Sequence, residues 1–143
     1  MRSTSILTLM INDHLRIVRL LNAVEENKDD FRSLMKSFNT FEWNFDKHIF
    51  TEEKAIFTQY NPEDVVWGYE MVPELMKEHG ELLNLLRKLK RDIKKRKTSG
   101  FQEFKKKLME HKNFEETNVY PILDQELDDS EKKTIIDRIT EIL

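Results

Sequence analysis

Two segments of this chain share a pattern in which large apolar residues at helical spacing lead into a histidine and then a glutamate. The first stripe consists of Phe38, Phe41, Phe45, His48 and Glu52, and the second of Phe101, Phe104, Leu108, His111 and Glu115. Residues three or four positions apart lie on one face of an α-helix, so each stripe predicts a long helix with polar groups in its buried face. A glutamate buried among phenylalanines is costly unless a cation or a hydrogen-bond donor compensates it. The chain therefore has to fold as packed helices with a partner for these carboxylates in the core.

The rest of the sequence is also typical of helices. Only three glycines and three prolines occur in 143 residues, and no segment alternates apolar and polar residues as a strand does. We expect an all-α domain spanning 1–143, with long helices at about 4–26, 30–58, 73–97 and 99–127. Pro73 suits the first position of the third helix, and Pro121 should kink the fourth or split off its last turn. Four long helices with short links predict an antiparallel up-down-up-down bundle, and a short C-terminal fifth helix should follow Asp128-Asp129-Ser130 and pack across one end.

The chain contains an internal repeat. A shift of about 65 residues lays Asp13-His14 over Glu78-His79, and a shift of 63 lays the first apolar stripe over the second. Each half then supplies one lone histidine and one His-x-x-x-Glu-Glu motif. The repeat predicts a bundle with an approximate two-fold axis that brings all four histidines together.

These residues predict a metal site without sulfur, because the chain has no cysteine. The candidate ligands are the histidines and the first glutamate of each motif: His14, His48, Glu52, His79, His111 and Glu115. Imidazole and carboxylate are compatible with iron, manganese, zinc or copper. Two-fold symmetry and two carboxylates that could bridge favour two metals. The absence of Glu-x-x-His and His-Glu-x-x-His motifs argues against a ferritin-like centre and a zincin.

The order of these motifs, with Tyr120-Pro121 after the last one, resembles the hemerythrin-like fold, also called the HHE cation-binding domain. The resemblance covers the chain from its first helix to Pro121. It implies a non-haem di-iron centre, with two iron ions joined by an oxo or hydroxo group. It also implies that the four histidines supply two nitrogens to each iron, while Glu52 and Glu115 bridge the pair. Other divalent metals stay compatible with the same ligands.

One position departs from the oxygen-carrying hemerythrins. They have a fifth histidine four residues after the third, where this chain has Leu83, and the repeat equivalent after His14 is Val18. Six protein ligands would leave both metals with an open position. We therefore expect a protein that binds or senses oxygen, nitric oxide or iron, rather than an oxygen carrier. Two alternatives stay open: a di-iron enzyme acting on peroxide, nitric oxide or ferrous iron, and an iron-donating or repair module that acts through a protein partner.

Residues near the motifs are expected to have simpler roles. We expect Asp13 and Glu78 to be solvated surface charges, and Glu53 and Glu116 to turn away from the ligand face. Asn44 is placed to hydrogen-bond the outer nitrogen of a ligand, and the phenylalanines of the two stripes should pack as ordinary core. Gly80 beside His79 either admits a close neighbour or is simply tolerated. Nothing in the sequence places Tyr60, Tyr69 or Tyr120 at the centre.

The net charge and hydropathy of the chain indicate no further binding partner. The net charge of −3 gives no general attraction to nucleic acid or to an anionic membrane, and the basic run at 87–97 is typical of a solvated helix end. The apolar stretches are too short to span a membrane, and the N-terminus is a poor secretory signal. We therefore expect a cytoplasmic protein that binds neither nucleic acid nor membrane.

Overall fold

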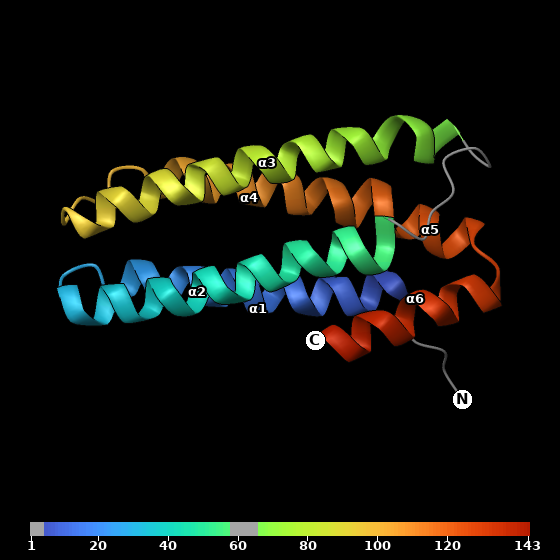
Figure 1. The fold of residues 1–143 in the computed structure, drawn as a ribbon, viewed down its shortest axis with the longest axis horizontal. Helices are drawn as coiled ribbons and strands as arrows, with labels where there is room; N and C mark the ends of the chain where they lie inside the picture. Colours follow the sequence, from blue (N-terminus) through green and yellow to red (C-terminus); the bar gives the residue numbers. More distant parts are fainter. Residues whose placement is uncertain (1–4, 58–65) are drawn as a thin grey trace.

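The computed structural model describes the backbone of residues 5–57 and 66–143, and the side chains of 5–57 and 71–143. Regular structure in these ranges is helical, which confirms the all-α prediction. The long helices α1 (Ile6–Glu26), α2 (Phe31–Thr51), α3 (Val66–Lys94) and α4 (Phe101–Phe114) lie lengthwise beside one another, and the chain reverses direction from each to the next (Figure 1). No helix in the described ranges is long and apolar enough to cross a membrane.

Each motif glutamate opens a turn of π-helix, which the sequence did not predict. The turn η1 (Glu52–Ile56) extends α2, and η3 (Glu115–Val119) extends α4. In each, the residue five positions after the glutamate donates its backbone N–H to the glutamate carbonyl: Phe57 to Glu52, and Tyr120 to Glu115. Wide turns of this kind are rare and occur often at functional sites. Here they lie at equivalent places in both halves of the repeat.

The fourth predicted helix is divided, as its proline suggested. After η3 the chain continues as α5 (Tyr120–Glu126), with Pro121 in its first turn, where a missing N–H costs little. The third prediction was wrong at its start, because α3 begins at Val66 and Pro73 lies inside it. Val72 and Leu75, on either side of this proline, both pack into the core. That packing accounts for a helix that continues through a residue with no hydrogen bond to donate.

Side chains cap the first and last helices at their N-termini. Ser5 caps α1 by accepting a hydrogen bond from the Thr8 N–H, and Asp124 of α5 accepts from the N–H groups of the first two residues of α1. The last helix, α6 (Asp129–Ile142), begins with the predicted cap at Asp128, which forms a capping box with Glu131. It packs against α1, α2 and η1 at one end of the bundle (Figure 1).

Two apolar clusters fill the bundle, one on each side of the histidines. On α1, Met10 belongs to the cluster nearer α6 and Ile17 to the cluster nearer the other end, with His14 between them. On α3, Leu75 and Leu82 flank His79 in the same way. The polar residues therefore form a single layer with apolar side chains above and below it, which keeps water out and strengthens electrostatic interactions inside it.

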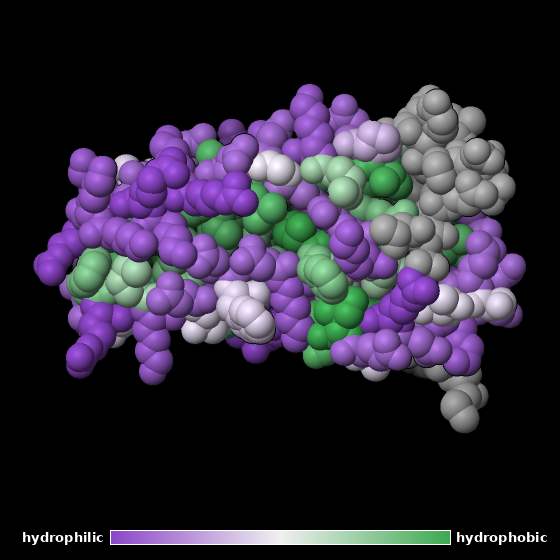
Figure 2. Space-filling view, viewed as in Figure 1, coloured by the Kyte–Doolittle hydropathy of each residue, from purple (hydrophilic) through white to green (hydrophobic). Residues whose placement is uncertain are grey.

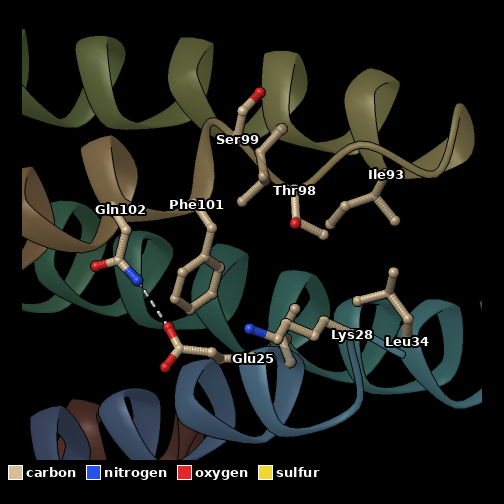
Figure 3. A pocket seen from close by; sticks show the side chains of 10 residues that line it. Glu25, Lys28, Leu34, Ile93, Thr98, Ser99, Phe101 and Gln102 are labelled. Atoms are coloured by element: carbon tan, nitrogen blue, oxygen red, sulfur yellow. Dashed lines mark hydrogen bonds between the residues drawn. The ribbon is translucent and has the colours of Figure 1, made fainter. Parts of the chain in front are cut away.

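Within the described residues, the only groups of histidine and acidic side chains spaced to hold a metal lie in this central layer. Polar and charged side chains cover most of the face in Figure 2, and apolar ones show along the seam between α2 and α3 and near the C-terminus. A cavity of about 290 Å³ lies at the end of the bundle away from α6. Leu34, Ile93 and Phe101 contribute to its apolar lining, and a hydrogen bond from Gln102 to Glu25 joins α4 to α1 beside it (Figure 3).

Candidate metal centre

Six side chains from the four helices and the two π turns meet in the central layer. They are the six predicted ligands, His14, His48, Glu52, His79, His111 and Glu115, and each is at most 4% exposed. Glu115 Oε1 lies 3.3 Å from the Nε2 atoms of both His14 and His111. Glu52 Oε1 lies 2.6 Å from His48 Nε2 and 3.6 Å from His79 Nε2. Each glutamate therefore points one oxygen between imidazoles from both halves of the repeat.

Most of these inward atoms lack a well-formed hydrogen bond within the described residues. Five of them are buried and make no hydrogen bond of good geometry, although glutamate oxygens and imidazole nitrogens face one another at 2.6–3.6 Å: Nε2 of His14, His79 and His111, and Oε1 of Glu52 and Glu115. Buried polar atoms are nearly always paired, so five converging exceptions need an explanation. A cation that accepts electron pairs from nitrogen and oxygen supplies one, and the donor set suits iron, manganese or zinc. The residues present therefore fit a metal.

The spacing of the atoms also fits a metal. Two groups of four residues each offer ligand atoms within 4.8 Å of one another: one joins both glutamates to His14 and His48, the other joins them to His79 and His111. Ligands on opposite sides of a metal at bond lengths near 2.1 Å are about 4.2 Å apart. Each group can therefore surround one ion with little adjustment, and the two groups share both carboxylates.

The outer nitrogen of each histidine is held by a carboxylate from a neighbouring helix. His14 Nδ1 pairs with Glu116 (2.8 Å), His48 Nδ1 with Asp13 (2.6 Å), His79 Nδ1 with Glu53 (3.1 Å) and His111 Nδ1 with Glu78 (2.9 Å). Every one of these acids is adjacent in sequence to a candidate ligand, and it contacts the histidine of a neighbouring helix. We call these four acids the carboxylate ring. A proton fixed on Nδ1 leaves Nε2 with its electron pair directed into the centre.

The carboxylate ring corrects two predictions. Asp13 is only 4% exposed, and Glu78, with a side chain that is 33% exposed, pairs with His111, so neither is simply a solvated surface charge. Glu53 and Glu116 do leave the ligand face of their own helices, but they turn toward the histidines of the adjacent ones. Asn44 bonds no ligand nitrogen and accepts instead from Arg16, which also donates to Asp13 at 2.6 Å. These positions could not be predicted from the periodicity of one helix, because periodicity shows on which face a residue lies but not which neighbouring helix packs against that face.

Replacing Asp13 with asparagine tests the ring. We expect the affinity for a divalent metal to fall by about 10–100-fold, because His48 loses the charge that fixes its Nδ1 proton and raises its basicity. Competition with a chromophoric chelator measures this. Asp29→Asn, at an exposed turn, is the matched control and should bind as the unmodified chain does. Equal affinities in the two variants would show that the ring does not act on the metal.

The carboxylates dominate the electrostatics of this layer. Burial opposes a charged imidazole, but the Glu52 carboxylate and the bond to Asp13 outweigh it and raise the pKa of His48 to about 10. Burial is likewise outweighed at His111, chiefly by Glu115, and its pKa rises to about 9. Burial opposes the charge of Glu52 too, yet His48 holds the pKa of that carboxyl well below its usual range. An environment that favours positive charge on buried imidazoles also favours a bound cation.

Tyr120 is a member of the centre that the sequence did not identify. It is fully buried, donates a short hydrogen bond to Glu52 Oε2, and places its oxygen 3.1 Å from Glu115 Oε2. Burial, reinforced by the two carboxylates, raises the pKa of its phenol well above the usual value. Tyr120-Pro121 is part of the family resemblance, but the contact of Tyr120 with Glu115 depends on the π turn, which the sequence did not predict.

The other residues singled out in the sequence lie outside the set of ligands. Phe45 packs as core and stacks near His48, with ring centroids 6.4 Å apart. Leu83 packs against the apolar cluster and supplies no ligand. Gly80 faces open space, so no close neighbour requires a glycine there. Tyr60 lies outside the described residues, as does the side chain of Tyr69.

Comparison with known families identifies the family of this chain. A model of the hemerythrin HHE cation-binding domain matches residues 5–123. The chain belongs to this family. No curated protein and no solved structure matches it. The match confirms the resemblance drawn from the motifs and indicates that the HHE domain of this chain binds a cation, for which its buried histidines and glutamates offer ligands. The matched residues end before α6, which lies outside the region that the family model covers.

Proposed function

We propose that this HHE domain is a cytoplasmic di-iron protein that binds or senses oxygen, nitric oxide or iron through a centre of four histidines and two glutamates in an up-down-up-down bundle. One observation carries the proposal: both glutamates belong to both groups of candidate ligands. His14 and His48 would hold one ion, His79 and His111 the other, and Glu52 and Glu115 would be shared. When bound, a pair of iron ions supplies redox activity and Lewis acidity toward small ligands.

The protein's own residues prepare this function in three ways. The carboxylate ring fixes the histidines with Nε2 inward, so little rearrangement is needed to bind. The apolar clusters on both sides exclude water from the layer. The chain offers six candidate ligands and no seventh at position 83, because Leu83 occupies the place where a further histidine would follow His79. The lack of a ligand at this position favours completion of the metal coordination by a small molecule rather than by another side chain.

Anaerobic reconstitution with ferrous iron tests the proposed function. The desalted protein should retain two iron atoms per chain, and exposure to oxygen should produce near-ultraviolet oxo-to-iron absorption. Stopped-flow mixing with oxygen, nitric oxide or peroxide should show one stoichiometric event. Sustained turnover would instead identify an enzyme. Less than one retained iron per chain, with no absorption change, would refute the di-iron proposal.

A further inference from the structure

Tyr120 touches both shared glutamates on the oxygens that face away from the histidines. Its hydroxyl donates to Glu52 Oε2 and lies 3.1 Å from Glu115 Oε2, while Oε1 of each carboxylate faces imidazole nitrogens. A carboxylate with one oxygen held cannot rotate freely about its last bond. One hydroxyl thus acts on the two residues that belong to both groups of candidate ligands.

The π turn explains how Tyr120 reaches Glu115. In an α-helix, residues five apart point about 140° away from each other, because each residue turns the chain by about 100°. In η3 the Tyr120 N–H bonds back to the Glu115 carbonyl, and this wider turn places both side chains on the inner face. Tyr120 is therefore held over Glu115 by the backbone as well as by its hydroxyl.

The internal repeat provides a comparison for the Tyr120 hydroxyl, because the equivalent residue in the other half has the ring without the hydroxyl. The residue equivalent to Tyr120 is Phe57, which follows Glu52 by five positions and ends η1 in the same way. Phe57 is also buried and stacks near His79 at 5.8 Å between centroids, while Tyr120 lies near His14 at 6.0 Å. The two halves match in histidines, glutamates and ring-shaped neighbours. They differ at this position by a single oxygen atom.

We propose that Tyr120 is the positioning residue of the centre, whose hydroxyl holds both shared glutamates so that each presents Oε1 to the metals. The inference rests on the proposed metal centre. It assigns Tyr120 no contact with a metal and no part in a reaction. Its contribution is to restrict two buried carboxylates before a metal arrives, which lowers the conformational cost of binding.

Tyr120→Phe is the primary test, because phenylalanine keeps the ring and removes only the hydroxyl. We expect affinity for Mn²⁺ or Fe²⁺, titrated anaerobically, to fall by about 10–100-fold while the far-ultraviolet circular dichroism stays unchanged. Unchanged affinity would overturn the proposal. Tighter binding would also overturn it, because it would mean that the hydroxyl competes with metal for the carboxylates.

The double variant Phe57→Tyr/Tyr120→Phe is the matched control. It preserves composition and moves the hydroxyl to the repeat-related position, so we expect it to recover affinity to within about threefold of the unmodified chain. If Tyr120→Phe alone fails to fold, the double variant still provides the comparison, and failure of a folded double variant to recover affinity would contradict the proposal. The metal centre itself is tested by Glu115→Gln: if the unmodified chain binds metal and this variant does not, the centre is supported whatever the tyrosine variants show. The proposed metal centre and the proposed role of Tyr120 can therefore fail separately.

Discussion

Glutamine in place of Glu115 should remove tight metal binding at both positions, whereas alanine in place of His14 should remove it at one. The two variants should differ because Glu115 belongs to both groups of four candidate ligands, whereas His14 belongs to only one. Glutamine keeps the size of the side chain but loses the charge that attracts a cation. After anaerobic reconstitution and desalting, elemental analysis should find close to no iron per chain for Glu115→Gln and about one for His14→Ala.

The matched control for these variants lies on the same helix. Glu110 directly precedes His111 and is exposed, so Glu110→Gln removes the same charge without touching the centre. It should retain the full two iron atoms. If Glu115→Gln kept as much iron as Glu110→Gln, the glutamate would be a core residue with no metal to hold. If His14→Ala lost all iron, the two positions would not bind independently.

Metal loading should raise the midpoint of thermal unfolding by roughly 10 °C or more. A ligand that binds only the folded chain stabilises it by about 4 kcal/mol at a free concentration 1,000 times the dissociation constant. For a domain of this size, each kcal/mol moves the midpoint by about 3 °C. The candidate ligands come from four helices and two π turns, so an unfolded chain cannot reproduce the proposed site. Calorimetry of the protein with and without ferrous iron, under argon, measures the shift.

Chelation should reverse this stabilisation, since the metal acts by binding rather than by altering the chain. Glu115→Gln should show a shift of less than about 2 °C under the same conditions. An equal shift in this variant would indicate that iron binds elsewhere, for example at surface carboxylates. No shift in the unmodified chain would mean that metal contributes nothing to the folded state.

The helices and the six candidate ligands were accessible from sequence because each depends on spacing along one helix. The stripe through Phe38, Phe45 and His48 fixes a buried face regardless of what packs against it. The same spacing placed His14 and His79 toward the centre, and the structure brings them there. Helical periodicity is a local property, so it survives without knowledge of the neighbours.

The carboxylate ring and Tyr120 were not accessible, because each depends on relations between helices or on a departure from α geometry. Asp13 has the sequence character of a surface acid, and only the position of α2 brings His48 against it. Tyr120 would lie away from Glu115 on a regular helix, and the π turn reverses that expectation. The predicted helix start at Pro73 was wrong for a related reason. Packing of the residues on both sides of Pro73 outweighed the preference of proline for the first turn of a helix.

The most direct test of the di-iron centre is a crystal structure of the anaerobically reconstituted protein, with anomalous diffraction recorded on both sides of the iron edge. We expect two iron peaks in the central layer, one beside Nε2 of His14 and His48 and the other beside Nε2 of His79 and His111. Both peaks should lie in contact with Glu52 and Glu115. A single peak, or no peak among these six side chains, would contradict the di-iron centre.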